Sequence, residues 1–431
     1  MKLSRPSALA GAASLASLVA VGAATGVALS SVAAPAYAAA GGLDPTFGTG
    51  GTVTTSTHYI GSAPPSAVLI QPNGKIVVIA ELTDPATDGD FGAVRYQANG
   101  TLDTSFGAGG EAAASFTNFI NTPNDAALQP NGDIVVAGDA ENATDTVNEF
   151  AVARFTAAGA LDSSFGAGGK VTTAFGGVLN PATAVLVQPN GDILVGGSDL
   201  KAAKTPTLTA LARYSPNGRL DTSFGTGGTV AVNAIGPVAA LGEDAAGDIF
   251  AVGTGGRIAE FSSAGVLQAG VTAAPITIAS TGGTSSTAFQ ANGSYLVGQT
   301  GATGVRRDAD AQVVRYLPTG AVESGFTNPP FDFSAAGTLA SDTIQALAVE
   351  PGGQVVVTGL HSAAGRTALG IARLDSNGAL DAIFAAGGVE TGPPGQGSAI
   401  AVQPNGDIVV AGELEPTGQT PQLVVQRYLG S

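Results

Sequence analysis

The chain has 431 residues and a formal net charge of −16 at pH 7, from 17 basic and 33 acidic side chains. Such an excess of negative charge repels nucleic acid and anionic membranes. The absence of cysteine excludes disulfides, thiol catalysis and cysteine metal sites.

The N-terminal segment, residues 1–40, differs from the rest of the chain. Lys2 and Arg5 precede a long run of Ala, Leu, Val and Ser, and the sequence APAYAAA then offers small residues to a signal peptidase. This pattern predicts a secretory signal peptide that ends at Ala38 or Ala40. An uncleaved anchor is the alternative, because the run is long enough to span a bilayer. We therefore expect a protein that a bacterium secretes or holds in its cell envelope.

From residue 41 onward the chain repeats a short apolar pattern, QPNGDIVVAG in its clearest copies. Two runs of β-branched residues flank a turn, and Asn-Gly accepts positive φ at low cost, so each copy predicts a hairpin of buried strands. The turn glycines are Gly74, Gly132, Gly191, Gly247, Gly293, Gly353 and Gly406, at spacings of 46 to 60 residues. These spacings define seven units.

Each unit contains two further elements. A third apolar run, such as FAVARF at 150–155, precedes a second tight turn, and a stretch such as LDSSFGAGGKVTT at 161–173 then ends in an alternating segment. Four short strands, repeated seven times, predict an all-β fold, a seven-bladed β-propeller of four-stranded antiparallel blades. A continuous parallel solenoid is the alternative, although it would need shorter and more even rungs.

The combination of LDxSFGxGG, QPNGDIVVAG and FAVARF resembles the delta-60 repeat family of bacterial secreted β-propellers. The strand order also resembles that of NHL-type propellers. The resemblance covers nearly the whole chain after residue 40. It implies the propeller fold, and it brings no established activity, substrate or catalytic residue.

An arginine in the third strand of six units is followed, eight residues later, by an acid. The pairs are Arg95 with Asp103, Arg154 with Asp162, Arg213 with Asp221, Arg315 with Glu323, Arg373 with Asp381, and Arg427 with Asp44 if counting continues from Ser431 to Gly41. In the remaining unit Glu260 replaces the arginine and Gln268 replaces the acid. We expect structural ion pairs across the turn between the third and fourth strands.

The last of these pairs predicts how the ring closes. Because the acid of Arg427 lies in the opening repeat, residues 43–55 should supply the fourth strand of the last blade. Residues 41–431 then form a single seven-bladed domain without a bare edge. A phenylalanine three residues after each acid should pack between blades: Phe47, Phe106, Phe165, Phe224, Phe326 and Phe384.

The connections between strands are of two kinds. The first-to-second and third-to-fourth turns are short and stereotyped, whereas the other loops differ from unit to unit and should share the opposite face. Binding residues are usually found on such variable loops. The candidate ligand-binding residues there are Asp84, Asp88, Asp90, Asp145, Arg306, Arg307 and His361.

The sequence gives little indication of which ligand or metal these candidate residues bind. Clustered acids such as those of DPATDGD at 84–90 suit calcium, but their spacing matches no EF-hand, and solvated acidic loops explain them as well. His58 and His361 have no identifiable partners for zinc binding or acid–base catalysis. We expect no cofactor and no metal, and leave calcium open as the alternative.

The sequence favours a secreted binding or scaffold module that acts through its variable-loop face. The expected partner is an extracellular protein or a cell-surface component, with no nucleic acid, no membrane span after signal removal, and a monomeric chain. The alternative is an extracellular hydrolase or lyase with carboxylates gathered at the central channel, since paired acids perform that chemistry. A spacer in the cell envelope is a third interpretation. No catalytic residue can be named.

Overall fold

The structure, a computed structural model, describes residues 39–55, 63–82, 89–116, 121–141, 148–201, 207–254, 257–268, 286–290, 292–302, 309–326, 329–334, 340–385, 387–414 and 421–430. Every regular element in these ranges is a β-strand. None of the described residues forms a helix with the length and apolar character that a membrane span requires. The predicted signal peptide lies outside the described residues, apart from its last two positions.

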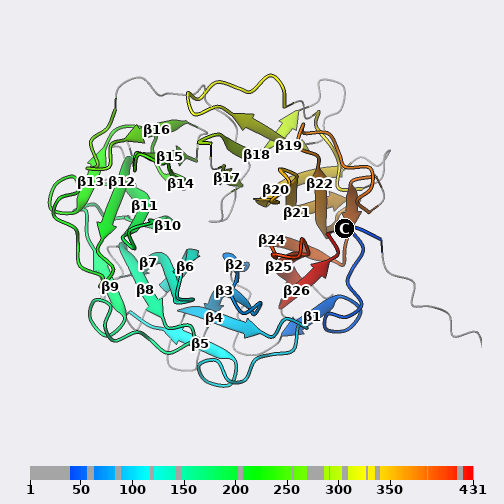
Figure 1. The fold of residues 1–431 in the computed structure, drawn as a ribbon, viewed down its shortest axis with the longest axis horizontal. Coiled ribbons are helices and arrows are strands. Elements are labelled where there is room, and N and C mark those ends of the chain that lie inside the picture. The colour runs from blue at the N-terminus through cyan, green and yellow to red at the C-terminus, as the bar shows by residue number, and fades with distance from the viewer. Residues whose placement is uncertain are drawn as a thin grey trace, which may run out of the picture. The chain divides into compact units, whose positions relative to one another are not determined.

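The strands form seven antiparallel sheets arranged in a ring (Figure 1), so the prediction of a seven-bladed β-propeller is confirmed. Blades 1 to 3 contain β2 (Ala67–Ile70), β3 (Ile76–Leu82), β4 (Asp90–Tyr96) and β5 (Glu111–Ala114); β6 (Asn121–Leu128), β7 (Ile134–Glu141), β8 (Asn148–Phe155) and β9 (Lys170–Thr173); and β10 (Ala182–Val187), β11 (Ile193–Asp199), β12 (Leu208–Tyr214) and β13 (Thr229–Val232).

The remaining blades follow in chain order. Blades 4 to 7 contain β14 (Val238–Glu243), β15 (Ile249–Gly253) and β16 (Ile258–Phe261); β17 (Thr287–Phe289), β18 (Tyr295–Ala302) and β19 (Ala309–Tyr316); β20 (Ala340–Val349), β21 (Val355–Ala363), β22 (Arg366–Leu374) and β23 (Val389–Thr391); and β24 (Gly395–Val402), β25 (Ile408–Leu414), β26 (Gln422–Tyr428) and β1 (Thr52–Thr55).

The first strand of each blade lies nearest the centre of the ring (Figure 1), and it contacts the first strand of the next blade. These contacts run from β2 through β6, β10, β14, β17, β20 and β24, and β24 in turn contacts β2. The second and third strands are mostly apolar because both of their faces are covered by neighbouring blades. Every residue of β3 and of β4 is buried, including Glu81, Asp90 and Arg95. The core is therefore a closed series of interfaces between blades.

Blades 4 and 5 differ from the predicted four strands, because their described residues form three strands each. In blade 5 the place of the fourth strand is taken by a single bridge between Phe331 and Ala311. Pro329 and Pro330 precede this bridge, and proline lacks the N–H that would extend a ladder. The corresponding residues of blade 4, 269–285, lie outside the described ranges.

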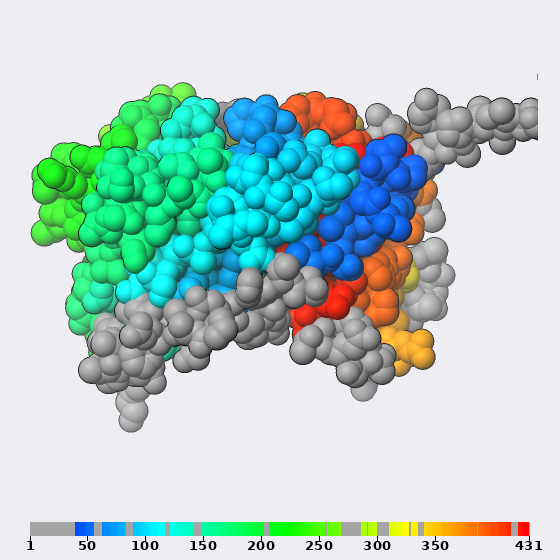
Figure 2. Space-filling view, turned by 90° about the horizontal axis from the view of Figure 1, so that it is seen from below, coloured from blue at the N-terminus to red at the C-terminus, as the bar shows by residue number. Residues whose placement is uncertain are grey.

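The seventh sheet contains segments from both ends of the described chain. Strand β1 pairs antiparallel with β26, with Thr52 opposite Gln426. Before this strand, the Gly41 N–H donates to the Leu429 carbonyl at 2.7 Å and the Asp44 N–H donates to the Arg427 carbonyl at 2.9 Å. Figure 2 shows this dark blue segment against red C-terminal residues at the outer side of the ring.

Candidate functional site

The two ends of the blades carry different kinds of connection. Neighbouring strands of each sheet are antiparallel and follow chain order from the centre outward, apart from β1, so successive connections alternate between the ends. We call the end with the first-to-second and third-to-fourth turns the turn end. The other end, with the second-to-third and fourth-to-first connections, is the loop end.

The turn end holds all six arginine–acid pairs that the repeat spacing predicts. The shortest nitrogen–oxygen distances are 2.7 Å for Arg95–Asp103, 2.7 Å for Arg154–Asp162, 2.7 Å for Arg213–Asp221, 2.7 Å for Arg315–Glu323, 2.9 Å for Arg373–Asp381 and 2.6 Å for Arg427–Asp44. In blade 4 the Gln268 N–H still donates to the Glu260 carbonyl at 2.8 Å, so the turn keeps its backbone bond without an ion pair.

Each arginine also reaches the following blade. The Arg95 Nη1 donates to the Ala157 carbonyl of blade 2 at 2.5 Å, and the Arg427 Nη1 donates to the Ala98 carbonyl of blade 1 at 2.5 Å. The guanidinium carbon of Arg95 lies 4.5 Å from the centre of the Phe106 ring. Because the same contacts recur around the ring, we interpret them as architecture and not as a catalytic site.

In four of the six pairs a hydroxyl residue two positions after the acid completes this arrangement, and the sequence analysis assigned it no role. The Ser164 hydroxyl donates to Asp162 Oδ1 at 2.7 Å, and the Ser164 N–H donates to the same oxygen at 2.9 Å. The hydrogen bond from the Ser164 hydroxyl, followed by its N–H and by Arg154, holds the pKa of Asp162 below its ordinary value. The sequence feature that could have identified this hydroxyl residue is the Ser or Thr that recurs in the LDxSFG motif.

The predicted ligand-binding residues divide into two groups. Asp84, Asp88, Asp145, Arg306 and Arg307 lie outside the described residues, as does His58. The other two lie at the loop end, but in strands and not in loops. Asp90 begins β4 and is buried, with 5% of its surface exposed, and His361 lies near the end of β21 with 7% exposed.

His361 faces a carboxylate across the hairpin of blade 6. Its Nδ1 lies 2.7 Å from Asp342 Oδ1, and Asp342 is fully buried. Burial raises the pKa of Asp342; the hydrogen bond and charge of His361 oppose this rise, and the neighbouring Asp332 carboxyl adds to it. Here two acids and a histidine converge. Asp342 has no exposed surface, the His361 side chain is 9% exposed, and Asp332 is partly buried.

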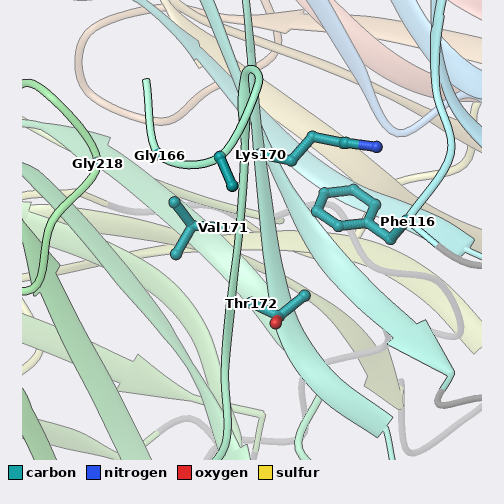
Figure 3. A pocket seen from close by; sticks show the side chains of 7 residues that line it. Phe116, Gly166, Lys170, Val171, Thr172 and Gly218 are labelled. Carbon is teal, nitrogen blue, oxygen red and sulfur yellow. The ribbon is translucent and has the colours of Figure 1, made fainter. Parts of the chain in front are cut away.

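A pocket of about 440 Å³ lies at the outer edge of blade 2, lined by residues of three blades (Figure 3). Lys170 and Val171 of β9 line it, together with Phe116 of blade 1 and Gly218 of blade 3. The Lys170 Nζ donates to the Ser115 carbonyl at 2.5 Å and lies 5.8 Å from the centre of the Phe116 ring. The lining contains no carboxylate, so the pocket offers no paired-acid chemistry.

In a chain without cysteine, the side chains that usually bind metal ions are those of His, Asp and Glu. Within the described ranges, no three or more His, Asp or Glu side chains are grouped so as to hold an ion. The acidic loop residues in which the sequence left calcium open, Asp84 and Asp88, lie outside those ranges.

The ring of repeated blades defines the chain as a β-propeller repeat protein. Four of its repeats, at residues 71–106, 129–165, 188–224 and 351–384, match the family described as a domain of unknown function (DUF5122) beta-propeller. No curated protein matches the chain.

Two solved structures are similar to the chain. The first is YCF48 bound to D1 peptide, with 11% identity, a TM-score of 0.42, and coverage of 88% of this chain and 96% of that chain. The second is Sqt1 of Chaetomium thermophilum, with 14% identity, a TM-score of 0.43, and coverage of 90% and 82%.

Proposed function

We propose that the chain is a secreted or envelope-bound binding module of a bacterium, and that its loop end contacts an extracellular protein or a cell-surface component. The observation that carries this proposal is a contrast between the two ends. At the turn end, the same arginine, acid and phenylalanine recur from blade to blade.

At the loop end, the residue type at one register position of the third strand differs between blades. The third strands of blades 1, 2, 3, 5, 6 and 7 carry, five residues before the arginine, Asp90, Glu149, Leu208, Asp310, Ala368 and Gln422. Residues that recur from blade to blade stabilise the common fold. Residues that differ between blades, at equivalent positions of a rigid fold, are typical of surfaces that bind a particular partner. Among the acids of this set Asp90 and Asp310 are buried, whereas Glu149 is partly exposed and is available to a partner that presents basic groups.

The hydrolase or lyase alternative would require acids in contact with a substrate. The described acids that converge, Asp332 and Asp342, belong to a group in which Asp342 is fully buried. A substrate could not contact Asp342 without a rearrangement of blade 6, which favours binding over paired-acid catalysis at this group.

The proposal is tested by charge exchange at each end of the blades. One variant combines Glu149→Lys with Arg366→Glu at the loop end, and its matched control combines Asp192→Lys with Arg219→Glu at the turn end. None of these four side chains is fully buried, and each pair leaves the net charge unchanged.

We expect labelled wild-type protein to bind to the envelope of cells that lack their own copy of the chain. The loop-end variant should lose about tenfold in affinity, as for truncation of an interface contact worth about 1.4 kcal/mol, and the turn-end control should bind as the wild type does. Equal binding by both variants, or loss only in the control, would contradict the proposal.

A further inference from the structure

One buried carboxylate at the loop end makes no hydrogen bond. Asp199 is the last residue of β11 and has no exposed surface, and neither Oδ1 nor Oδ2 makes a hydrogen bond. A buried carboxylate that makes no hydrogen bond is destabilising, even though the charge of exposed Lys201 acts on Asp199. The side chain therefore needs an explanation beyond packing.

The fold itself does not require an acid at this position. Asp199 pairs with Leu208, the residue five positions before Arg213, and the same register is occupied in blades 1, 2 and 7 by Leu82, Ala140 and Leu414. The hairpin thus forms with apolar residues in blades 1, 2 and 7, and with Gly301 and His361 at this register in blades 5 and 6. Among the blades whose described residues include this position, only blade 3 has a carboxylate there, which points to a ligand.

A second unpartnered oxygen lies beside it. Asn180 is fully buried, and its Nδ2 donates to the Asn148 carbonyl at 2.9 Å and to the Gly177 carbonyl at 3.1 Å. These two acceptors determine which end of the amide is the nitrogen. The Asn180 Oδ1 is left without a hydrogen bond.

The free oxygens converge beside Gly177. A Cβ placed on this glycine would clash with Asp199 Oδ1 and would lie 2.7 Å from the Leu200 carbonyl oxygen and 3.0 Å from Asn180 Oδ1. The Leu200 carbonyl also accepts the Val178 N–H at 2.8 Å and, at the longer distance of 3.4 Å, the Leu179 N–H, which holds the connection between blades 2 and 3 against the end of β11. A carboxylate, an amide oxygen and a carbonyl are the ligand types that calcium prefers.

We propose that Asp199, Asn180 and the Leu200 carbonyl bind a calcium ion, with water completing its coordination. The ion would neutralise the buried carboxylate and would join the segment 177–180 to the end of β11. With a single carboxylate the site should be weak, with a dissociation constant on the order of 10⁻⁴ to 10⁻³ M, as in extracellular calcium modules.

The competing explanation is a proton. Burial raises the pKa of Asp199, with the charge of Lys201 opposing this rise, and a protonated carboxyl could donate to Asn180 Oδ1. The two explanations differ in what Asp199→Asn does. An amide reproduces the protonated acid, so stability would be kept without any response to calcium.

The experiment measures the melting temperature of the chelator-treated protein in 0 to about 10 mM calcium chloride, with magnesium chloride as the reference salt. The wild type should melt a few degrees higher in calcium, with a rise that grows with concentration, because the ligand binds the folded state. Magnesium should act weakly, since it demands a smaller octahedral site. Asp199→Asn and Asp199→Ala, the latter the residue of blade 2, should lose this rise, and Asp192→Asn, a control acid at the turn end of the same blade, should keep it.

Several outcomes would overturn the proposal. These are a wild type that does not respond to calcium, and an Asp199→Asn variant whose calcium-dependent rise equals that of the wild type. The comparison of variants also separates this site from any calcium bound by acids elsewhere in the chain. Failure of both variants to fold, judged by circular dichroism, would show that the fold itself needs the acid and would contradict the proposal as well.

Discussion

The six arginines of the third strands each combine three contacts. In blade 1, the Arg95 Nε donates to Asp103 Oδ2 at 2.7 Å, Nη1 donates to the Ala157 carbonyl of the next blade, and the guanidinium lies over the Phe106 ring. The planar, multivalent head group of arginine makes this combination, which the single ammonium of lysine could not reproduce. One side chain thus stabilises its own hairpin and the interface to its neighbour.

The loss in the free energy of unfolding when one of these ion pairs is broken should be larger for a more buried pair. The Asp103 side chain is 3% exposed and also accepts a hydrogen bond from Lys75, whereas the Glu323 side chain is 30% exposed. Asp103→Asn should lower the free energy of unfolding by about 3–5 kcal/mol, because it leaves buried Arg95 without its acid. Glu323→Gln should cost about 0–1 kcal/mol. Urea unfolding at pH 7 measures both, and equal costs would contradict this account.

The difference in the free energy of unfolding between the wild type and Asp103→Asn should depend on pH. Burial opposes ionisation of Asp103, but the hydrogen bonds from Lys75 and Ser105 and the charge of Arg95 outweigh it and hold the pKa of Asp103 far below its usual range. A carboxylate with a depressed folded pKa stabilises the protein above the unfolded value of about 4 and loses this effect as the pH falls. The difference between wild type and Asp103→Asn should therefore shrink below about pH 4.

The arginine–acid spacing could be read from the sequence because six copies repeat it at a fixed offset of eight residues. Asp199 could not be identified in this way. Its significance depends on the register that aligns it with Leu82 and Ala140, and on the fold that brings Asn180 beside it. His361 was expected in a loop because the sequence does not mark where the long β21–β22 hairpin ends.

Local turn chemistry decides where strands end. The β21–β22 hairpin has Ala363 opposite Arg366, so its turn consists of Ala364 and Gly365, with φ of 50° and 74°. Two consecutive residues at positive φ are typical of a type I′ turn, which favours Asn-Gly. An alanine at the first position is strained, because its Cβ disfavours the left-handed region.

Replacing this residue should stabilise the hairpin. Ala364→Asn should raise the free energy of unfolding by on the order of 0.5–1 kcal/mol, since asparagine tolerates positive φ better than alanine does. Gly365→Ala serves as the control: a Cβ there would meet nothing within 4 Å, so only its conformation is penalised and the protein should be destabilised. Thermal unfolding checks both variants, and a lower melting temperature for Ala364→Asn would refute the turn assignment.

The ring as a whole is held by the same contacts that join each pair of blades. The Arg427 Nη1 donates to the Ala98 carbonyl across the junction of blades 7 and 1, as the Arg95 Nη1 does to Ala157 across the junction of blades 1 and 2. The number of blades was predictable because the turn glycines repeat seven times. The shortened fourth strand of blade 5 was not, because its sequence departs from the repeat and its prolines limit pairing to one bridge.

The closure of the ring by both ends of the chain is tested most directly by an engineered disulfide, since the chain contains no cysteine. Thr52 lies opposite Gln426, and the Gln426 Nε2 donates to the Thr52 hydroxyl at 3.2 Å. In Thr52→Cys/Gln426→Cys, oxidation of the folded protein should form an intramolecular disulfide, detected by mass spectrometry, and should raise the melting temperature. The control Thr52→Cys/Thr229→Cys, which places its second cysteine in blade 3, should form none. Absence of the disulfide in the first variant, or equal yields in both, would contradict the closed ring.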